Sequence, residues 1–411
     1  MRKKLHSRLA LAGLAMLAAG SAMATTGPAQ TFMFAQDDNA VTANQNPAGL
    51  SRIKEPEVVF QALDFDSTST FQYTTNVSPA ETSYNSGGNT FIPLVYYATP
   101  INDKMGAGIF VTGNSISSDF GNTGPASYIV TSYNLTTAQL QGNLSYQVMD
   151  KLSLGGGLSV NYTSFEYNSN VLNLEPDSSP GQMKLQDSDI TTSYVLSLLY
   201  EFSPQTRLSL VYRSKINPQL SSTPEYSGLG PLRQALINAN PGAFNQQVSM
   251  GVDIPRMVFA GLYHRFDSGD ETELDVGWIE ASEFGLSEIT LGQKQINNRG
   301  QDLNNVWASS LGYTHPLNTQ WQLSAGAMYV SSAVSDQNRT FIFKPDSLWG
   351  VGVGAEYKAS KHLIYGLNLN YYKLGPAKTT AYIDEINATL NGEYTTHYAF
   401  GLDFTVRWIG F

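Results

Sequence analysis

The sequence predicts an all-β fold, a 14-stranded antiparallel transmembrane β-barrel. Three observations predict it. Apolar and polar residues alternate along many segments, 11% of the residues are aromatic, and only 14% are charged. In such a barrel every second strand residue faces lipid, so a mean hydropathy of −0.20 conceals the apolar face. Beyond residue 24, no stretch of the sequence approaches the ~20 apolar residues of a membrane-spanning helix.

The alternation also indicates which kind of β-protein this is. In residues 152–164, leucine, valine and tyrosine share one face, while serine, glycine, asparagine and threonine share the other. In residues 348–357, Trp349 and Tyr357 close the two ends of the apolar face. A soluble β-sandwich would bury a core rich in Leu, Ile, Val and Phe, with aromatic residues placed irregularly. Repeated Tyr and Trp at the ends of an apolar face instead favour the aromatic girdles of a membrane barrel.

Each predicted strand follows from this alternation. The predicted strands are 57–66, 91–99, 105–113, 137–149, 152–166, 190–202, 206–216, 254–266, 272–284, 305–316, 320–332, 347–358, 362–373 and 396–411. Short and long connectors alternate strictly between them. Because outer-membrane barrels place short turns in the periplasm and long loops outside, both ends of the barrel are expected to face the periplasm. The last strand is out of phase between Trp408 and Phe411, and a bulge near Trp408 would restore the phase.

The N-terminus reads as a secretion signal. A basic start is followed by an apolar run from Leu9 to Ala19 and by Ala22-Met23-Ala24, a small-x-small cleavage pattern. The expected division is therefore 1–24 signal peptide, 25–56 periplasm-side hatch and 57–411 barrel with long extracellular loops. Removing the four basic residues of the signal from the 24 in the chain leaves 20 against 34 acidic residues, which makes nucleic acid an improbable partner. The chain has no cysteine, so disulfides contribute nothing.

A turn-rich segment precedes the first predicted strand. Residues 35–50 carry the acids Asp37 and Asp38, small polar residues and then Asn46-Pro47-Ala48-Gly49. If the following strand begins at the periplasmic rim, this segment can fold up into the lumen and meet polar residues of the inner wall. Asp37 and Asp38 then become candidates for hydrogen bonds or ion pairs inside the barrel.

No arrangement of residues predicts catalysis, a cofactor or a metal centre. After the expected signal the histidines are His264, His315, His362 and His397, which lie on different predicted strands outside any G-x-S-x-G or H-x-x-x-H context. We therefore expect no enzyme activity, and read the histidines as wall or turn residues. The acids Asp177, Asp187 and Asp189 indicate a solvated loop more than a calcium site.

The long connector 217–253 contains a helix signal. Pro231 marks the start, Leu232 and Leu236 repeat at helical spacing, and Asn240-Pro241-Gly242 marks the stop. An extracellular helix with an apolar stripe must pack on something. The stripe either packs on a neighbouring loop or lines an entry groove for a hydrophobic ligand, and the two are compatible.

Several stretches together resemble the FadL/TodX family of outer-membrane transporters of hydrophobic compounds. The segment DDNAVTANQNPAGL resembles the family hatch, and ATPINDKMGAGIFVTGN is similar to its third strand. LYEFSPQTRLSLVYRSKI, DIPRMVFAGLYHRF and SDQNRTFIFKPDSLWGVGVGAEY resemble its seventh, eighth and twelfth strand regions. They occur in family order and cover nearly all of the chain after residue 24.

The resemblance implies a fold, a function and a set of residues. The implied fold is a 14-stranded barrel with an N-terminal hatch, or plug, inside its lumen. The resemblance also implies uptake of long-chain fatty acids or aromatic hydrocarbons, captured by extracellular loops, passed to an inner apolar pocket and released by hatch movement and a lateral opening. The implied hatch and gating residues are Asp37, Asp38, Asn46, Pro47, Ala48, Gly49, Gly106 and Gly108. The implied capture loops are 167–189 and 217–253. Their expected ligand-contacting residues are Val171, Leu172, Leu174, Met183, Leu232, Leu236, Ile237 and Phe244.

A carboxylate headgroup would need a cation or hydrogen-bond donors, for which Arg213, Arg233 and Arg256 are the candidates. The expected partners are the hydrophobic ligand, outer-membrane lipid and lipopolysaccharide, and the barrel-assembly machinery during biogenesis. Two departures from the family pattern, a shorter plug and a shorter 167–189 loop, make a smaller or aromatic substrate plausible. The alternatives are a general diffusion porin, an adhesin or structural barrel, and a lipid-modifying enzyme.

Overall fold

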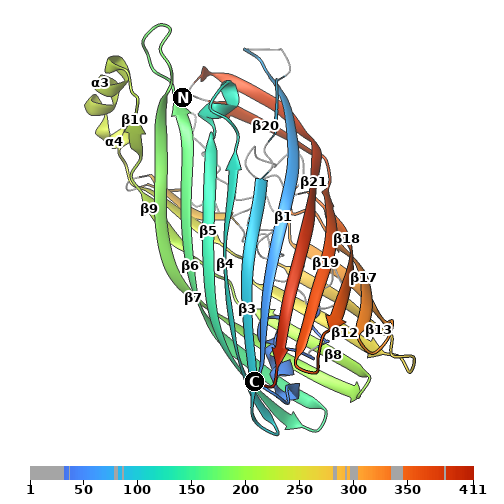
Figure 1. Ribbon diagram of the computed structural model, residues 1–411. Coiled ribbons are helices and arrows are strands. Elements are labelled where there is room, and N and C mark those ends of the chain that lie inside the picture. The colour runs from blue at the N-terminus through green and yellow to red at the C-terminus, as the bar shows by residue number, and fades with distance from the viewer. Residues whose placement is uncertain are drawn as a thin grey trace.

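The computed structural model describes residues 32–36, 38–77, 82–85, 88–280, 285–291, 294–296, 304–334, 346–383 and 386–411, and shows a tall closed barrel (Figure 1). The expected signal peptide 1–24, the first residues of the expected hatch and Asp37 lie outside the described residues.

Fourteen antiparallel strands form the wall, so the predicted fold and strand number are confirmed. In wall order they are β1 (Glu57–Thr75), β3 (Gly88–Asn102), β4 (Met105–Asp119), β5 (Ser132–Met149), β6 (Leu152–Val171), β7 (Gly181–Ser203), β8 (Thr206–Arg213), β12 (Met257–Arg265), β13 (Glu271–Ile279), β16 (Val306–Pro316), β17 (Trp321–Val330), β18 (Leu348–Lys358), β19 (Leu363–Leu374) and β21 (Ala388–Ile409). The barrel closes where β21 pairs with β1, with Glu57 opposite Ile409. Among the described residues, every wall strand thus pairs with a neighbour on each side, as a lipid-embedded sheet requires, although β4 pairs with β3 only as far as Thr112.

At the end away from the short turns, β1, β3 to β7 and β21 extend beyond the predicted bounds, whereas β8, β12, β13 and β17 are shorter than predicted. β1 continues to Thr75 and β21 begins at Ala388, and the two pair along this extension. Three short strands in predicted connectors join the wall sheet, namely β2 (Thr82–Asn85), β10 (Glu225–Ser227) and β20 (Ala377–Ile383). A separate sheet joins β9 (Gln219–Ser222), β11 (Val248–Asp253), β14 (Gly285–Leu291) and β15 (Lys294–Ile296). Polar Ser/Thr-rich stretches carry no apolar alternation, so the sequence pattern could not find these extensions.

The outer wall is apolar, with aromatic residues grouped near both ends of the strands. Trp349, Tyr371 and Phe400 lie together toward the long-loop end, with ring centroids 5.8 Å and 5.2 Å from Tyr371 to the other two. Trp321 and Tyr357 lie 4.7 Å apart where β17 leaves a short turn. This distribution matches the girdles of membrane barrels.

The last strand of the barrel reaches Phe411 without a bulge near Trp408. The register of β21 against β1 shifts between Thr70 and Phe71, opposite Thr396 and Tyr394, and not near Trp408. At the C-terminal end, Gly410 adopts a φ of 66°, which residues with a side chain rarely tolerate. This turn returns Phe411 to the outer surface, where its ring lies 5.5 Å from Trp408.

The inner wall has two chemically different halves, whereas the sequence predicted a polar or glycine face throughout. Toward the short turns it carries buried polar residues such as Gln141, Ser153 and Ser197. Toward the long loops it carries a large apolar cluster that includes Phe71, Phe165 and Tyr394. An apolar upper lumen can solvate a hydrophobic molecule, which a uniformly polar wall would not.

The hatch lies inside the barrel near the short-turn end, where Figure 1 shows it in blue. It contains a short helix α2 (Thr42–Gln45) and a 3-10 helix η1 (Pro47–Arg52), which pack on the inner faces of β3 to β7. A second 3-10 helix, η2 (Pro125–Tyr128), and the helices α3 (Pro231–Ala239) and α4 (Pro241–Phe244) belong to the connectors at the other end. None of the helices in the described part of the chain is long and apolar enough to cross a membrane.

Candidate functional site

Residues 32–36, here called the arm, precede the hatch helices and lie against β13. Three acids face inward from alternate positions of that strand, Glu271, Glu273 and Asp275, and each accepts hydrogen bonds from the arm. Asp275 accepts from the backbone N–H groups of residues 33 and 34 at 3.2 and 3.3 Å. Glu273 accepts from the N–H of residue 35 at 2.7 Å, and Glu271 from the Gln36 amide at 3.2 Å. Side-chain carboxylates thus replace the backbone partners that an extended segment would find in a sheet.

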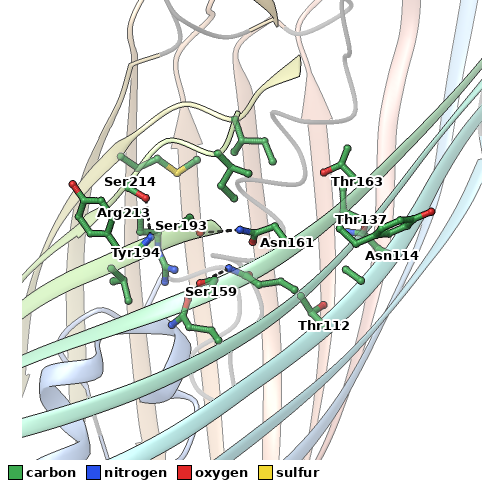
Figure 2. A pocket seen from close by; sticks show the side chains of 18 of the residues that line it. Thr112, Asn114, Thr137, Ser159, Asn161, Thr163, Ser193, Tyr194, Arg213 and Ser214 are labelled. Atoms are coloured by element: carbon green, nitrogen blue, oxygen red, sulfur yellow. Dashed lines mark hydrogen bonds between the residues drawn. The ribbon is translucent and has the colours of Figure 1, made fainter. Parts of the chain in front are cut away.

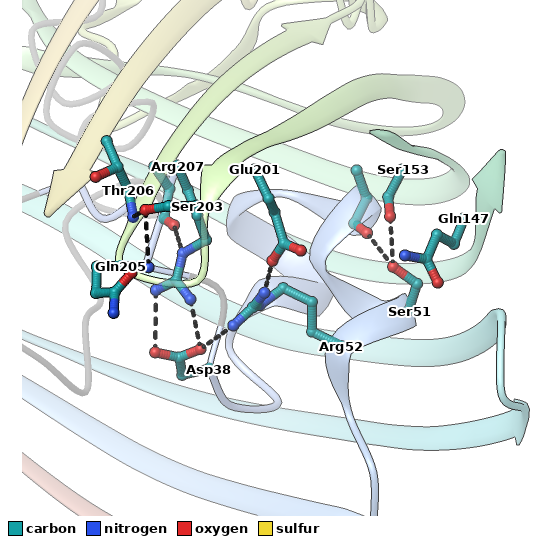
Figure 3. A network of polar contacts seen from close by, with 12 residues as sticks. Asp38, Ser51, Arg52, Gln147, Ser153, Glu201, Ser203, Gln205, Thr206 and Arg207 are labelled. Carbon is teal, nitrogen blue, oxygen red and sulfur yellow. Dashed lines mark hydrogen bonds and ion pairs between the residues drawn. The ribbon is translucent and has the colours of Figure 1, made fainter. Parts of the chain in front are cut away.

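Asp38 joins the hatch to the wall through arginines (Figure 3). Arg207 on β8 donates to both carboxylate oxygens at 3.0 Å, and Arg52 at the end of η1 donates to one at 3.1 Å. Arg52 also pairs with Glu201 on β7. Burial raises the pKa of Asp38, but the charges of Arg207 and Arg52 outweigh it, so the pKa lies below its ordinary value. Asp38 is therefore charged at neutral pH. Its ion pair with Arg207 holds the segment at Asp38 against β8, and the pair of Arg52 with Glu201 holds η1 against β7.

The Asn46-Pro47-Ala48-Gly49 stretch forms the turn from α2 into η1. The Asn46 side chain accepts from the Ala48 N–H at 3.2 Å, and it donates to the carbonyl of Phe34 in the arm at 2.9 Å. The Ala48 N–H also donates to Ser197 on β7 at 2.9 Å. Asn46 therefore caps one hatch helix and connects it to the arm.

Three wall glycines allow the hatch to approach closely. A Cβ at Gly106 would lie 2.1 Å from the Leu50 carbonyl oxygen, and one at Gly155 would lie 2.2 Å from the Ala48 nitrogen. At Gly108 it would lie 2.8 Å from the Cβ of Ala43. Gly106 and Gly108 therefore contact the hatch directly, and their role in gating stays a prediction.

A polar-lined pocket opens in the lumen above the hatch (Figure 2). Arg213, at the end of β8, lies among Ser159, Asn161 and Ser193 on β6 and β7, with apolar Met257 nearby. The pocket volume is about 100 Å³. The Arg213 guanidinium donates to the carbonyl of Asn44, in the last turn of α2. Among the described residues no carboxylate lies within ion-pair distance of Arg213, so its charge faces the pocket uncompensated.

The sequence pattern of the family described as "Outer membrane protein transport protein (OMPP1/FadL/TodX)" matches residues 4–408. The chain belongs to the FadL/TodX family. Family membership places it in the Gram-negative outer membrane and makes it a non-enzymatic transporter of hydrophobic compounds.

Relatives of this FadL-family chain are distant. It is 20% identical over 357 residues to the "Long-chain fatty acid transport protein" of Salmonella typhi, covering 81% of each chain. It is 21% identical over 427 residues to "Outer membrane protein P1" of Haemophilus influenzae, covering 90% of each. Among solved structures, a Pseudomonas aeruginosa FadL homologue superposes with a TM-score of 0.79 at 17% identity, covering 90% of this chain and 94% of that one. The Pseudomonas putida toluene transporter TodX gives 0.63 at 14% identity, with the same coverage. At these identities the solved structures confirm the fold.

The other two arginines proposed for a carboxylate in this FadL-family chain are already engaged. Arg256 pairs with Glu280 through two nitrogens. Arg233 on α3 is buried and donates to the carbonyl of Leu172 at 2.5 Å. Of the three candidates, only Arg213 lines the lumen pocket.

The predicted capture residues lie at the long-loop end but in different environments. The predicted helix is confirmed as α3, yet its buried residues are Arg233 and Ile237, whereas Leu232 and Leu236 are exposed. The predicted loop 167–189 is mostly strand, because β6 runs to Val171 and β7 starts at Gly181. Of its apolar residues, Leu174 is exposed, Val171 is buried and Met183 packs on the apolar cluster; Leu172 and, on α4, Phe244 are half-buried.

Two of the three loop acids have structural partners in the described part of the chain. Asp187 accepts from the Ser221 N–H at 2.6 Å and Asp189 from the Gln219 N–H at 2.8 Å, so both hold β9 in place. In the described part of the chain, no group of three or more potential metal ligands comes together.

Sequence reasoning missed the β13 acids and the arginines that bind Asp38. The signal was present: Glu271, Glu273 and Asp275 repeat at period two in a strand, where a charge on the inward face is costly without a partner. Their partners lie more than 200 residues away in sequence, so the pattern shows that partners must exist without identifying them.

Proposed function

We propose that this FadL-family chain mediates passive, gated uptake of hydrophobic molecules that carry an anionic headgroup, of the long-chain fatty acid class. Extracellular loops capture the ligand and pass it into the lumen, where the headgroup binds Arg213. Hatch movement and a lateral opening in the wall then release it.

The uncompensated charge of Arg213 carries this proposal. It lies at the boundary between the apolar upper lumen and the hatch, where an amphiphile moving head-first would stop. A carboxylate can bind a guanidinium through two hydrogen bonds between opposite charges, whereas a backbone carbonyl carries no net charge and offers a single oxygen. A ligand carboxylate would therefore compete with the Asn44 carbonyl for Arg213, and its binding would release α2 from the wall.

The charge of the lower lumen supports release of an anionic ligand through the barrel wall. Below Arg213, acids outnumber arginines among the described inward residues. The acids are Asp38, Glu57, Glu201, Glu271, Glu273, Asp275, Glu356 and Asp403, and the arginines are Arg52, Arg207, Arg265 and Arg407. A carboxylate continuing straight down would meet net negative charge at low dielectric.

The β3–β4 boundary supports a lateral opening. β4 pairs with β5 along Met105–Asp119, whereas its pairing with β3 covers only Met105–Thr112. That ladder ends at Leu94, next to Pro93, which has no N–H to donate. Separating these two strands above Thr112 therefore breaks fewer hydrogen bonds than separating β4 from β5.

The outer loops support capture. Leu174, Leu232 and Leu236 expose 45%, 55% and 37% of their surface at the long-loop end. Exposed apolar side chains contribute ~25 cal/mol per Å² when a hydrophobic ligand covers them. Such a surface can concentrate a sparingly soluble molecule before it enters the lumen.

A second candidate function is uptake of neutral aromatic hydrocarbons. The upper lumen favours it, since Phe71, Tyr73 and Tyr394 form an aromatic group with centroids 5.7 and 4.6 Å from Phe71. Such faces and edges suit a ring ligand. TodX, a solved relative, is described as a toluene transporter.

Binding of hexadecanoate, hexadecanol and toluene to the purified protein distinguishes the candidates. Under the proposal, wild-type protein binds hexadecanoate more tightly than hexadecanol, and Arg213→Gln removes the difference, a loss of about 10- to 100-fold expected for a charge-assisted pair. Arg256→Gln, which removes an arginine already paired with Glu280, serves as the matched control and should retain the preference. Equal binding of the two 16-carbon probes by wild type, with tight toluene binding, would support the second candidate.

A further inference from the structure

A polar groove lies on the outer surface of the barrel, beyond the aromatic girdle at the long-loop end. Strands β20, β21 and β1 continue there, at the end of the barrel opposite the C-terminus (Figure 1). Their inward side chains, such as Ala377 and Tyr394, belong to the apolar cluster of the upper lumen, so the residues between them face outward. These outward residues line a groove of about 360 Å³, and they include Gln72, Thr74, Lys378, Thr380, Asn391 and Glu393.

The groove has the side chains of a sugar-binding site. Hydroxyl and amide groups can both donate and accept hydrogen bonds, as sugar hydroxyls do. The Thr380 hydroxyl donates to the Asn391 side-chain oxygen at 3.0 Å, and the two N–H donors of Asn391 have no partner among the described residues. The groove volume lies within the ~300–1,000 Å³ range of small-molecule sites. A sugar ring can therefore enter the groove and meet donors and acceptors together.

Lys378 brings a positive charge into the groove. It lies directly opposite Glu393 in the β20–β21 ladder, but within the described ranges neither side chain forms an ion pair. A lysine ammonium binds phosphate as a point charge, and a carboxylate accepts hydrogen bonds from hydroxyls. The two side chains therefore suit a ligand that carries an anionic group beside hydroxyl groups.

A second lysine lies in the aromatic girdle itself. Lys373 on β19 is the ladder partner of Trp349 on β18 and of Tyr398 on β21, so the three side chains share one row of the outer face. Aromatic girdles mark the boundary between acyl chains and lipid headgroups, so this ammonium lies at the level of headgroup phosphates. β20 follows β19 along the same edge of β21, which places Lys378 five residues beyond Lys373, at most ~17 Å away.

We propose that the outer face of β19, β20, β21 and β1 at the long-loop end is a binding site for lipopolysaccharide, the phosphorylated glycolipid of the outer leaflet. Its acyl chains cover the apolar wall below the girdle, and Lys373 binds a phosphate at the headgroup level. The groove binds the sugars that follow, with Lys378 on a second anionic group. The inference does not depend on the transported ligand, because the whole site lies outside the lumen.

Charge and continuity favour this occupant over others. The chain has a formal net charge of −10, so most of its surface repels a polyanion, whereas Lys373 and Lys378 follow each other along one ribbon without an ion-pair partner in the described ranges. The groove continues upward from the apolar outer wall, which membrane lipid already covers. A glycerophospholipid can reach Lys373 but has no sugars for the groove. A second copy of this chain would bring equally acidic surface.

Binding of three lipids to the full-length protein in detergent, measured by native mass spectrometry, tests the site. The probes are lipopolysaccharide truncated after its inner core sugars, lipid A without core sugars, and phosphatidylglycerol. Lys373→Ala/Lys378→Ala should bind the truncated lipopolysaccharide about three- to tenfold more weakly than wild type, as expected for two exposed charged contacts. Lys361→Ala is the matched control and should bind like wild type, because it removes an exposed lysine from the opposite end of β19.

The groove has its own variant. Thr380→Ala/Asn391→Ala should weaken binding of the probe with core sugars and leave lipid A binding unchanged, because lipid A ends below the groove. Hexadecanoate binding should stay at the wild-type level in every variant, which shows that each one is folded and keeps this result separate from the proposed function.

Three results would overturn the proposal. Equal weakening of phosphatidylglycerol and lipopolysaccharide by the lysine variant would indicate a general anionic-lipid surface. Unchanged binding of the sugar-bearing probe by the groove variant would exclude the groove. Loss of all binding in EDTA would show that metal ions on acids such as Glu393 or the exposed Asp66, and not the lysines, hold the lipid.

Discussion

At the scale of single residues, Asp38 has more arginine partners than any other acid of the described hatch. Arg207 and Arg52 bind it directly, and a nitrogen of Arg265 lies 3.6 Å from one of its oxygens. Arg207 is almost fully buried, so the loss of Asp38 would leave a buried cation without its acid. The ion pair contributes to hatch docking only while the carboxyl is charged.

The lowered pKa of Asp38 predicts an acid-sensitive hatch. A group whose pKa is depressed by docking contributes stability above its ordinary pKa of ~3.9, and that contribution is lost as the pH falls through the docked value. Conductance of wild-type protein in planar bilayers should be low from neutral pH down to about 4 and rise below it. Asp38→Asn should already conduct more at pH 7.

The two proteins should converge in acid, because wild-type Asp38 is then neutral as well. Asp64→Asn on the outer face of β1 is the control and should follow wild type throughout, since within the described ranges the side chain of Asp64 bonds to Asn89 and to no residue of the hatch. An unchanged conductance for Asp38→Asn at pH 7 would show that the Asp38 cluster does not hold the hatch.

At the scale of elements, the fit between η1 and the glycines of β4 and β6 places the hatch. Gly106 and Gly155 face η1 from two strands, and each lies too close to its backbone for any side chain. The absence of side chains at these two positions leaves room for η1 on the inner wall. Beside them, the Ser153 hydroxyl accepts a hydrogen bond from the Ser51 hydroxyl at 2.8 Å. These wall glycines therefore allow η1 to lie directly against the barrel wall.

Gly155→Ala should displace the hatch and leave the barrel folded. The new methyl would lie 2.2 Å from the Ala48 nitrogen, so η1 must move, at a cost of ~1–3 kcal/mol typical of overpacking. Hydrogen exchange of the Ala48 amide, which donates to Ser197, should accelerate, and basal conductance should rise. Gly142→Ala on the adjacent strand is the control, because a Cβ there meets nothing within 4 Å. Equal behaviour of the two variants would rule out the close fit as the cause of docking.

At the scale of the whole molecule, the barrel combines a fixed wall with a separable insert. The wall is closed by continuous backbone pairing around all fourteen strands. The contacts we describe between hatch and wall are side-chain hydrogen bonds, ion pairs and packing on glycines. The hatch can therefore move without breaking the hydrogen bonds between wall strands.

A disulfide between hatch and wall tests whether it moves. The chain has no cysteine, so a single pair can be introduced without competing thiols. A Cβ at Gly108 would lie 2.8 Å from that of Ala43, about 0.7 Å short of the usual disulfide range of ~3.5–4.5 Å, so a small shift of α2 brings the pair into range. Oxidised Ala43→Cys/Gly108→Cys should lose hexadecanoate uptake in vesicles, and reduction should restore it. Undiminished uptake by the oxidised protein, with the single variant Ala43→Cys as reference, would show that α2 need not leave β4.

The sequence alone determined the wall. A period of two is a local property, visible in segments such as 152–164 and 348–357, and each segment reports its own strand without knowledge of its partner. The number of strands, their order and the end that carries the short turns all follow from it. The tight turn sequence at Asn46-Pro47 likewise indicated a compact segment ahead of β1.

Only the tertiary structure decided how the lumen is organised. Phe34 stacks on Phe259, and Asp275 binds the arm, although these partners lie more than 200 positions apart in the sequence. Arg213 likewise meets Asn44, 169 positions away, at the edge of the pocket. Alternation says that a residue faces inward but not at what height or opposite which neighbour. The height of an inward residue and its neighbours are set by barrel closure and by the path of the hatch through the barrel. The wall could therefore be predicted from local pattern, whereas the site could not.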